Sequence, residues 1–451
     1  MTLDRLDAAA RPAPDAGADD SRRVSVLLGL LFGLVGMGSS SAAVAIPLIS
    51  EDFGVSAGNA TWTISLYALM LAVATAVYGR VSDLVGIRLP LLVGITLMTA
   101  GAVLAALAPE FWVLLVARVV QGAGAAAVPT LGVAVLNARY DGSVRGLALG
   151  RLAGIAAAVS CLGPLTGGLV EHAFGWRAVM GLPVLAVAVV PIVWYALTRE
   201  GTGARLDLLG AVLVALTAAG VVLIVQSPST GLVVTAAGSA LLLLGTPAVA
   251  ARVKRRPHGF LPAEVVRNGT VVRSGIAAAA VPAAWFALLV GVPAVLVGHG
   301  WEPWQVGLLL LPSAAIALFV PRLAGRALAR YGPARSIAAA AAVSAVALPV
   351  TGLGAALVSA PLLGAGVLLV TIAFGVGQPA MTASVADAVA PDVRGVALGV
   401  ATLVFLVGGS VGSAVVGGLG DVVGVGWALT VLAVLPLAGL AVIRAEVRAT
   451  R

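Results

Sequence analysis

Long apolar runs divide this chain, and they constrain its fold more than any other feature of the sequence. Fourteen runs each hold about 20 mostly apolar residues, the length that a helix needs to cross a bilayer. They lie near 24–48, 60–79, 89–108, 112–136, 146–170, 178–198, 207–226, 231–251, 272–297, 304–321, 336–357, 361–383, 395–419 and 426–444. Since 60% of the residues are hydrophobic and only 10% are charged, a soluble domain could not bury this much apolar surface. The sequence predicts an all-α polytopic membrane protein with 14 transmembrane helices.

The positive charges fall on alternate loops between these runs. If the N-terminus is cytoplasmic, the cytoplasmic loops and tails hold nearly all the arginines, whereas the outer loops hold only Arg177. This is the positive-inside pattern, and six of the eight tryptophans then fall at the outer interface, as an aromatic belt requires. We therefore expect a multi-pass protein of the cell membrane (inner or plasma membrane), with both termini cytoplasmic.

An internal repeat indicates that the chain has two related halves. Val144–Gly150 (VRGLALG) matches Val393–Gly399 (VRGVALG) at an offset of 249, and the spacing of Gly79–Gly86 recurs in Gly325–Gly332 at an offset of 246. Two parallel six-helix halves are the plan of transporters that bind their substrate between the halves. The predicted organisation is a disordered cytoplasmic tail (1–23), a first half (24–198), an inserted helix pair (199–251), a basic cytoplasmic loop (252–271), a second half (272–444) and a cytoplasmic tail (445–451).

A polar stretch between the second and third runs, GRVSDLVGIR, is expected to form a loop at the membrane surface. Its counterpart in the second half keeps the glycines and the basic residues, but has Ala329 where the first half has Asp83. The shared residues are therefore architectural, and the carboxylate is the functional candidate. The candidate residues of this gating stretch are Gly79, Arg80, Asp83, Gly86 and Arg88.

Arg118 is the only charge well inside a predicted span, and it shares a helix face with Gln121. A buried charge in the membrane costs several kcal/mol unless it faces a partner or a cavity. We interpret Arg118 as a coupling or substrate contact; the alternative is a structural arginine held by Gln121 and carbonyl groups. No acidic residue lies in mid-membrane, so Asp83 and Asp207, both at cytoplasmic helix ends, are the remaining coupling candidates, with Asp387 weaker.

The fifth run carries closely spaced small residues that favour tight helix packing. Its second part reads GPLTGG, where the proline removes a backbone hydrogen bond and bends the helix. The candidates here are Gly163, Pro164, Gly167 and Gly168. Other side chains within spans are candidates for a substrate cavity: Ser40, Tyr67, Trp285 and Gln378. For Trp285, simple helix packing is an equal alternative.

The sequence contains no arrangement of residues that is typical of an enzyme. The three histidines do not cluster, no metal-ligand spacing occurs, and the single Cys161 excludes an intrachain disulfide and a cysteine-based metal site. The basic stretch 252–256 is interpreted as an ordinary positive-inside loop and not as a nucleic-acid site. We expect a monomer whose partners are a small-molecule substrate and the lipid bilayer, with no cofactor other than protons as the coupling ion.

Three motifs together resemble the major facilitator superfamily. GRVSDLVGIR at 79–88 resembles its signature between helices 2 and 3, ARVVQGAGAAA at 117–127 its helix-4 signature, and GPLTGG at 163–168 its helix-5 antiporter signature. Fourteen spans and RLDLLG at 205–210 resemble the fourteen-helix drug:proton antiporters of the QacA/EmrB kind, and residues 76–168 look similar to the tetracycline exporters of the TetK/TetL type. The chain departs from the family pattern in its first span, where Gly38, Ser39 and Ser40 stand at the positions that commonly include an acid.

The resemblance implies a secondary exporter of small hydrophobic compounds (a drug, an antibiotic or a metabolite) that works by proton antiport with alternating access. In such a transporter Asp83 would help to lock the outward-facing state, Arg118 would couple the cavity to proton movement or contact the substrate, and the bend at Gly163–Pro164 would seal one half against the other. A proton-independent facilitator or an importer of a metabolite is the alternative, which the missing mid-membrane carboxylates favour. A non-transporting receptor or scaffold is a third hypothesis.

Overall fold

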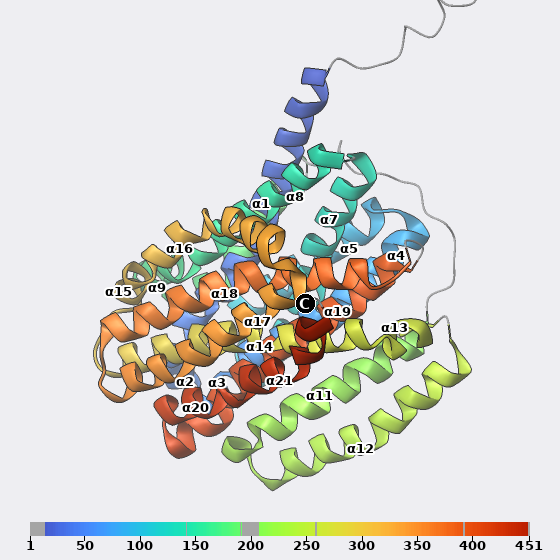
Figure 1. Ribbon diagram of the computed structural model, residues 1–451. Helices are drawn as coiled ribbons and strands as arrows, with labels where there is room; N and C mark the ends of the chain where they lie inside the picture. The colour runs from blue at the N-terminus through green and yellow to red at the C-terminus, as the bar shows by residue number, and fades with distance from the viewer. Residues whose placement is uncertain are drawn as a thin grey trace, which may run out of the picture.

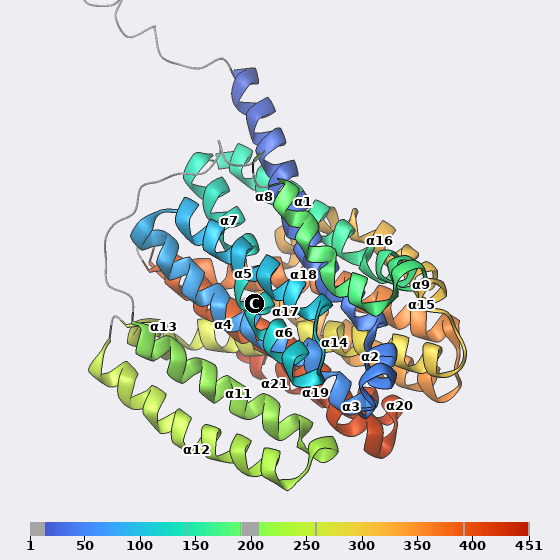
Figure 2. The same ribbon diagram turned by 180° about the vertical axis from the view of Figure 1, so that it is seen from behind.

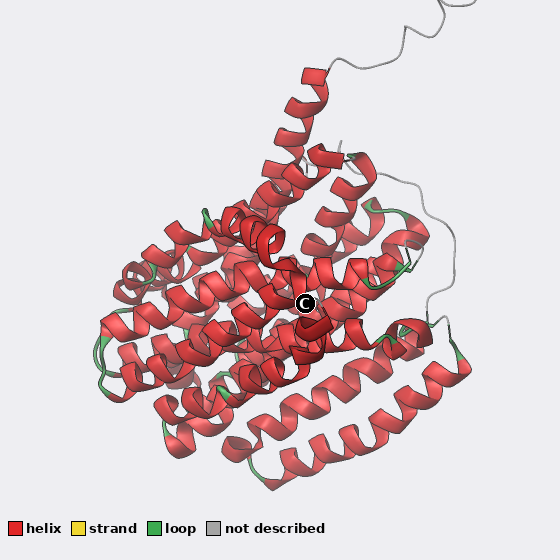
Figure 3. Ribbon diagram, viewed as in Figure 1, coloured by secondary structure: helices red, strands yellow, loops and turns green. Residues whose placement is uncertain are grey.

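The computed structural model describes residues 14–140, 142–189, 191, 207–257, 259–390 and 393–449. Within these residues helices are joined by loops and turns, and there is no strand (Figure 3). Twelve helical segments of the described chain are long and apolar enough to cross a membrane. The prediction of an all-α membrane protein is confirmed at this level.

The helices form in the following order. They are α1 (Pro14–Val44), α2 (Ile46–Phe53), α3 (Ala57–Ala60), α4 (Trp62–Val85), α5 (Arg88–Ala106), α6 (Phe111–Ala125), α7 (Ala127–Arg139), α8 (Gly142–Cys161), α9 (Gly163–Gly181), the 3-10 helix η1 (Leu182–Val189), α11 (Leu208–Thr230), α12 (Leu232–Arg255), α13 (Ala263–Arg267), α14 (Gly269–Gly298), α15 (Pro303–Leu309), α16 (Leu311–Ala317), α17 (Val320–Ala356), α18 (Ala360–Asp387), α19 (Arg394–Val423), α20 (Val425–Leu432) and α21 (Val434–Ala449).

The twelve segments differ from the fourteen predicted runs at two places. The fifth and sixth runs form one continuous segment of 42 residues, Leu147–Ala188, although the backbone bends inside it at Gly175. The tenth run is divided into α15 and α16, each of seven residues and too short to count as a span. The remainder of the sixth run, beyond residue 189, lies largely outside the described residues.

Two boundaries of the sequence analysis need correction. Helix α1 begins at Pro14, so residues 14–23 are helical and do not form a disordered tail. Proline at the first helical position favours this start, because its fixed φ suits the helix and its missing N–H would have no partner there. The polar stretch after Gly79 is also helical up to Val85, and the turn itself is confined to Gly86 and Ile87.

The repeat extends to the backbone. Gly86 (φ 79°, ψ −177°) ends α4, and its counterpart in the repeat, Gly332 (φ 76°, ψ 171°), bends α17. Gly175 (φ 77°, ψ 171°) and Gly424 (φ 83°, ψ 151°) form a second matched pair. This backbone region is essentially restricted to glycine. The two pairs are separated by the same offsets as the sequence repeats, so the two halves turn in the same way at equivalent residues.

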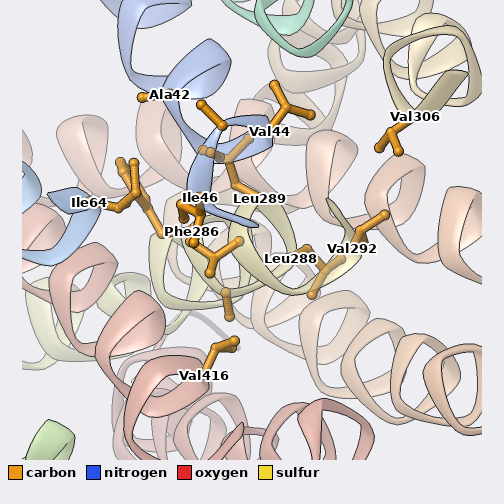
Figure 4. Packing of buried hydrophobic residues seen from close by; sticks show 14 of the residues in the cluster. Ala42, Val44, Ile46, Ile64, Phe286, Leu288, Leu289, Val292, Val306 and Val416 are labelled. Atoms are coloured by element: carbon orange, nitrogen blue, oxygen red, sulfur yellow. The ribbon is translucent and has the colours of Figure 1, made fainter. Parts of the chain in front are cut away.

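The helices differ strongly in how deeply they are buried. In the most apolar window of α14, 83% of the residues are buried, whereas the figure for α12 is 11%. Helix α14 therefore lies in the centre of the bundle, and its Leu288, Leu289 and Val292 pack in one cluster with Val44 and Ile46 of α1 and α2 (Figure 4). Helices α11 and α12 form a hairpin along one edge of the bundle (Figures 1 and 2).

The two halves meet along two helix pairs. Helix α4 of the first half runs beside α19 of the second, where the hydroxyl oxygens of Ser65 and Ser413 lie 3.0 Å apart. Helix α9 of the first half packs on α15 of the second. A Cβ on Gly168 would collide with the backbone of Pro303 and Trp304, and a Cβ on Gly307 with that of Leu165. Glycine allows these backbones to approach closely.

Candidate functional site

A cavity lies between the two halves near the middle of the molecule. From the first half, the lining includes Ser40 of α1, Ser160 and Cys161 of α8, and Pro164 of α9. From the second half, it includes Trp285, Leu288 and Leu289 of α14, Leu310 just before α16, Ser313 of α16 and Val367 of α18. About 340 Å³ of atom-free space, part of it open to solvent, lies among these side chains. Three predicted residues, Ser40, Pro164 and Trp285, thus line one space, although they are far apart in the sequence.

The lining of this cavity is uncharged. The hydroxyl of Ser40 donates to the carbonyl oxygen of Ser160 at 2.6 Å, and the hydroxyl of Ser313 donates to that of Leu310 at 2.5 Å. Both hydroxyl protons are therefore used inside the protein. An apolar wall with a few polar groups is the usual lining of a site for small hydrophobic molecules.

Trp285 belongs to a row of aromatic rings that extends away from the cavity. Its ring centroid lies 5.9 Å from that of Phe374, which lies 5.5 Å from that of Phe405. The two interpretations of Trp285 are therefore both partly met, because the side chain lines the cavity and also packs between helices. Tyr67 and Gln378 are not among the lining residues: Tyr67 is buried beside Arg118, and Gln378 is half-buried on α18.

The glycines of the fifth predicted run hold one wall of the cavity in place. Helix α8 ends at Cys161 and α9 begins at Gly163. The helix is therefore interrupted next to Pro164, where the sequence predicted a bend. A Cβ on Gly163 would collide with the Ser40 hydroxyl, and a Cβ on Gly167 would lie 2.7 Å from Cβ of Ser41. Gly163 and Gly167 thus fix α9 against α1, while Gly168 makes the contact across the halves.

Arg118 is fully buried on α6, and its partners are neutral. Its Nε donates to the carbonyl oxygen of Thr63 at 2.8 Å, and its Nη1 donates to Oε1 of Gln121 at 2.5 Å. The guanidinium carbon lies 4.3 Å from the centroid of the Tyr67 ring, a cation–π contact. These contacts are the ones expected of the structural alternative, in which Gln121 and a carbonyl group hold the arginine. The coupling or substrate role of Arg118 and Gln121 stays a prediction, and Tyr67, expected to line a cavity, contacts the guanidinium of Arg118.

Asp207 lies in a different environment from Arg118 and shares no partner with it. Its carboxylate accepts from the backbone N–H of Gly210 at the start of α11, from the N–H of Phe260 and from Arg252 at 2.5 Å. The hydrogen bond from Arg252 holds the pKa of Asp207 below its usual value. These contacts fasten both helices of the α11–α12 hairpin to the segment that follows, which is an architectural role at this end of the molecule.

The gating stretch is described only in part. Gly79, Gly86 and Arg88 have the positions given above: within α4, at its C-terminal turn and at the start of α5. The side chains of Arg80 and Asp83 lie outside the described ones, although both residues belong to α4. The proposed lock at Asp83 stays a prediction.

The sequence analysis missed Gln226, which lies fully buried where three parts of the molecule meet. Its Nε2 donates to the carbonyl oxygen of Gly58 at 3.0 Å and to Oγ1 of Thr61 at 2.9 Å. The backbone of Gln226 also lies so close to Gly418 of α19 that a Cβ there would be 2.9 Å from its Cα. The sequence feature that could have pointed to Gln226 is a lone amide at the end of an apolar run, since such a group needs hydrogen-bond partners in lipid.

This chain belongs to the Major Facilitator Superfamily, whose sequence model matches residues 28–413. It is 28% identical over 303 residues to the multidrug resistance protein Stp of Mycobacterium tuberculosis, covering 64% of this chain and 55% of that protein. It is 31% identical over 335 residues to the cephamycin export protein CmcT of Amycolatopsis lactamdurans, covering 69% and 67%. The alignment with Stp thus spans just over half of that relative's length.

Solved structures support the fold alone. A POT family transporter in complex with 5-aminolevulinic acid superposes with a TM-score of 0.67 at 14% identity, over 94% of this chain and 95% of that one. The human organic anion transporter MFSD10 superposes with a TM-score of 0.65 at 15% identity, over 96% and 100%. The chain is therefore a multi-pass membrane protein with the fold of its superfamily, and its relatives include proteins named for multidrug resistance and cephamycin export.

Proposed function

We propose that this protein is a fourteen-helix secondary exporter that moves small hydrophobic compounds across the cell membrane by proton antiport. The observation that carries the proposal is the uncharged cavity between the halves, walled by leucines and Trp285 and bounded by the Gly163–Pro164 break. A site between two halves that rock against each other is the alternating-access design. The relatives named for drug and antibiotic export support this direction of transport.

Transport into proteoliposomes with an imposed pH gradient tests the proposal. We expect a lipophilic drug or dye to accumulate on the acidic side and to move the other way when the gradient is reversed. Accumulation that ignores the gradient would favour the alternative, a proton-independent facilitator or importer, which the absence of any acidic residue from the cavity lining supports.

The role proposed for Asp83 is tested in the same vesicles. Asp83→Asn removes the charge while keeping the side-chain shape, and we expect gradient-driven transport to be lost. The matched control is Glu264→Gln, because Glu264 is an exposed acid on the short helix α13. Unchanged transport in Asp83→Asn would remove this residue from the mechanism.

The fourteen-span topology rests on the repeat. Gly424 separates two candidate spans in the second half, and its equivalent Gly175 bends the 42-residue segment in the first. A helix of that length would extend about 63 Å, twice the hydrocarbon thickness, so the segment suits two crossings. Cys161→Ser gives a cysteine-free background. In this background, Phe174→Cys should react with an impermeant maleimide added outside intact cells. Arg322→Cys should react only after permeabilisation. Protection of Phe174→Cys in intact cells would contradict this topology.

A further inference from the structure

Arg118 differs from four partly exposed arginines of the described chain in what balances its charge. Four arginines form ion pairs with carboxylates: Arg139 with Asp20, Arg177 with Asp52, Arg252 with Asp207 and Arg273 with Glu446. All four keep part of the side chain exposed, between 26% and 45%. Arg118 is fully buried, and no carboxylate in the described part of the chain pairs with it. The arginine with the least access to water therefore has no counter-charge.

Two hydrogen-bond donors at this site also lack an acceptor within the described residues. They are Nη2 of Arg118 and Nε2 of Gln121. The two side chains are linked, since Oε1 of Gln121 accepts from Nη1 of Arg118. A buried donor without an acceptor loses its hydration and gains nothing, and the penalty is larger for a charged group. A site with one net positive charge and two unsatisfied donors favours an acceptor that carries negative charge.

The donors are held rigidly by close helix packing. A Cβ on Gly122 would collide with the backbone of Tyr67 on α4, and a Cβ on Gly101 of α5 would lie 2.5 Å from the backbone nitrogen of Gln121. Thr63 and Tyr67 hold the remaining faces of the guanidinium. Donors held in place before binding suit a small anion, because little conformational entropy is lost when it binds.

We propose that Arg118 and Gln121 form an internal anion site that takes a carboxylate or a halide. The anion supplies the negative charge that the chain itself does not provide at this point. The same N–H groups would donate to the acidic group of a transported compound or to an anion from solution. The inference rests on the proposed function only where the anion is part of the transported compound.

Thermal unfolding of the purified full chain tests the site without any transport. Sodium formate is compared with formamide, a neutral molecule of nearly the same size. We expect the unfolding midpoint to rise with formate concentration and not with formamide, because a ligand that binds only the folded state stabilises it by mass action. The rise should be lost in Arg118→Met and kept in Arg177→Met, which removes an arginine that already pairs with Asp52. Equal shifts for formate and formamide, or a formate shift that survives in Arg118→Met, would overturn the proposal.

A second variant gives a readout that survives if Arg118→Met fails to fold. Gln121→Glu keeps the acceptor for Arg118 and supplies the missing charge from within the chain. We expect its midpoint to exceed that of the wild type without formate and to respond no further when formate is added. A Gln121→Glu protein that remains as sensitive to formate as the wild type would exclude the site.

Transport distinguishes the two sources of the anion. If the anion travels on the substrate, the wild type should transport a carboxylic acid better than the matching amide, and Gln121→Glu should lose this preference. If it comes from solution, transport of a neutral compound should depend on formate concentration in the wild type alone. A pH gradient that fails to drive transport would contradict the proposed antiport and leave the formate-dependent midpoint in place, so the two proposals fail separately.

Discussion

The two ends of the contact between α4 and α19 are packed very differently. At one end, a Cβ on Gly417 would collide with Oγ1 of Thr61, and the hydroxyl oxygens of Ser65 and Ser413 are 3.0 Å apart. Near the other end, an added Cβ on Gly399 would meet no atom of the described residues within 4 Å, and one on Gly79 would meet, among them, only Thr130 of α7, at 3.7 Å. One end of the interface is closed and the other is open.

The residues compared at the two ends are matched in helical register. About five helical turns separate Thr61 from Gly79, and the same sequence spacing separates Gly399 from Gly417. Gly79 and Gly399 therefore lie on the same helix faces as the tightly packed pair and would meet if α4 and α19 stayed parallel. Because they do not meet, the helices diverge over about 27 Å. This is the geometry of two halves that pivot, closed at one end while the other is open.

The largest expected effect is at the closed end. Gly417→Leu places a branched side chain against the Thr61 hydroxyl, and we expect the free energy of unfolding to fall by about 3 kcal/mol, the upper part of the range for overpacking. Thermal unfolding in detergent measures this change, and Gly417→Ala should show a smaller loss. A Gly417→Leu protein as stable as the wild type would mean that the contact is not closed.

The matched change at the open end should affect transport and spare stability. Gly399→Leu meets free space in this conformation, so the unfolding midpoint should hardly change. In the conformation where this end closes, the leucine would overpack against Gly79 at a cost of about 1–3 kcal/mol, which lowers that population by a factor of about 5 to 150. Transport in proteoliposomes should fall accordingly. Normal transport by Gly399→Leu would show that α4 and α19 never meet at this end.

Removal of the Gln226 amide sharpens the comparison at the closed end. Gln226→Leu deletes the hydrogen bonds to Gly58 and Thr61, and we expect a loss of about 1–2 kcal/mol in the free energy of unfolding. Because these bonds tie the α11–α12 hairpin to the closed end, the variant should also open that end more often. The rate at which a maleimide reacts with Thr61→Cys measures this opening. The rate should be higher in the Gln226→Leu background than in Thr61→Cys alone, and equal rates would limit Gln226 to a packing role.

The smallest expected effect is at the hydroxyl pair. Ser413→Ala removes the contact with Ser65, and the remaining hydroxyl of Ser65 keeps its bond to the carbonyl oxygen of Thr61. We expect a change of about 0.5 kcal/mol in unfolding free energy, near the low end for a single hydrogen bond. A loss as large as that of Gln226→Leu would show that this pair, and not the amide, holds the closed end.

Much of the architecture could be predicted from the sequence, because every segment in the membrane has lipid as its solvent. Apolar runs predict helices because a backbone in lipid must satisfy its own hydrogen bonds. The repeated glycines predicted matched turns, and the structure confirmed them at Gly86 and Gly332. The buried charge of Arg118 was evident from its isolation within a run, and its contact with Gln121 followed from their spacing on one helix face.

The tertiary structure alone decided which helix faces meet. It brought Ser40 and Trp285 to one cavity and placed Tyr67 beside Arg118 and Gln226 at the closed end. It also gave Gly417 a tight neighbour, whereas Gly399 has none among the described residues. The physical reason is that lipid is as apolar as the interior of the bundle. Hydrophobic periodicity therefore does not mark the face that a helix turns toward its neighbour, and that choice rests on close packing and on a few polar contacts between distant segments.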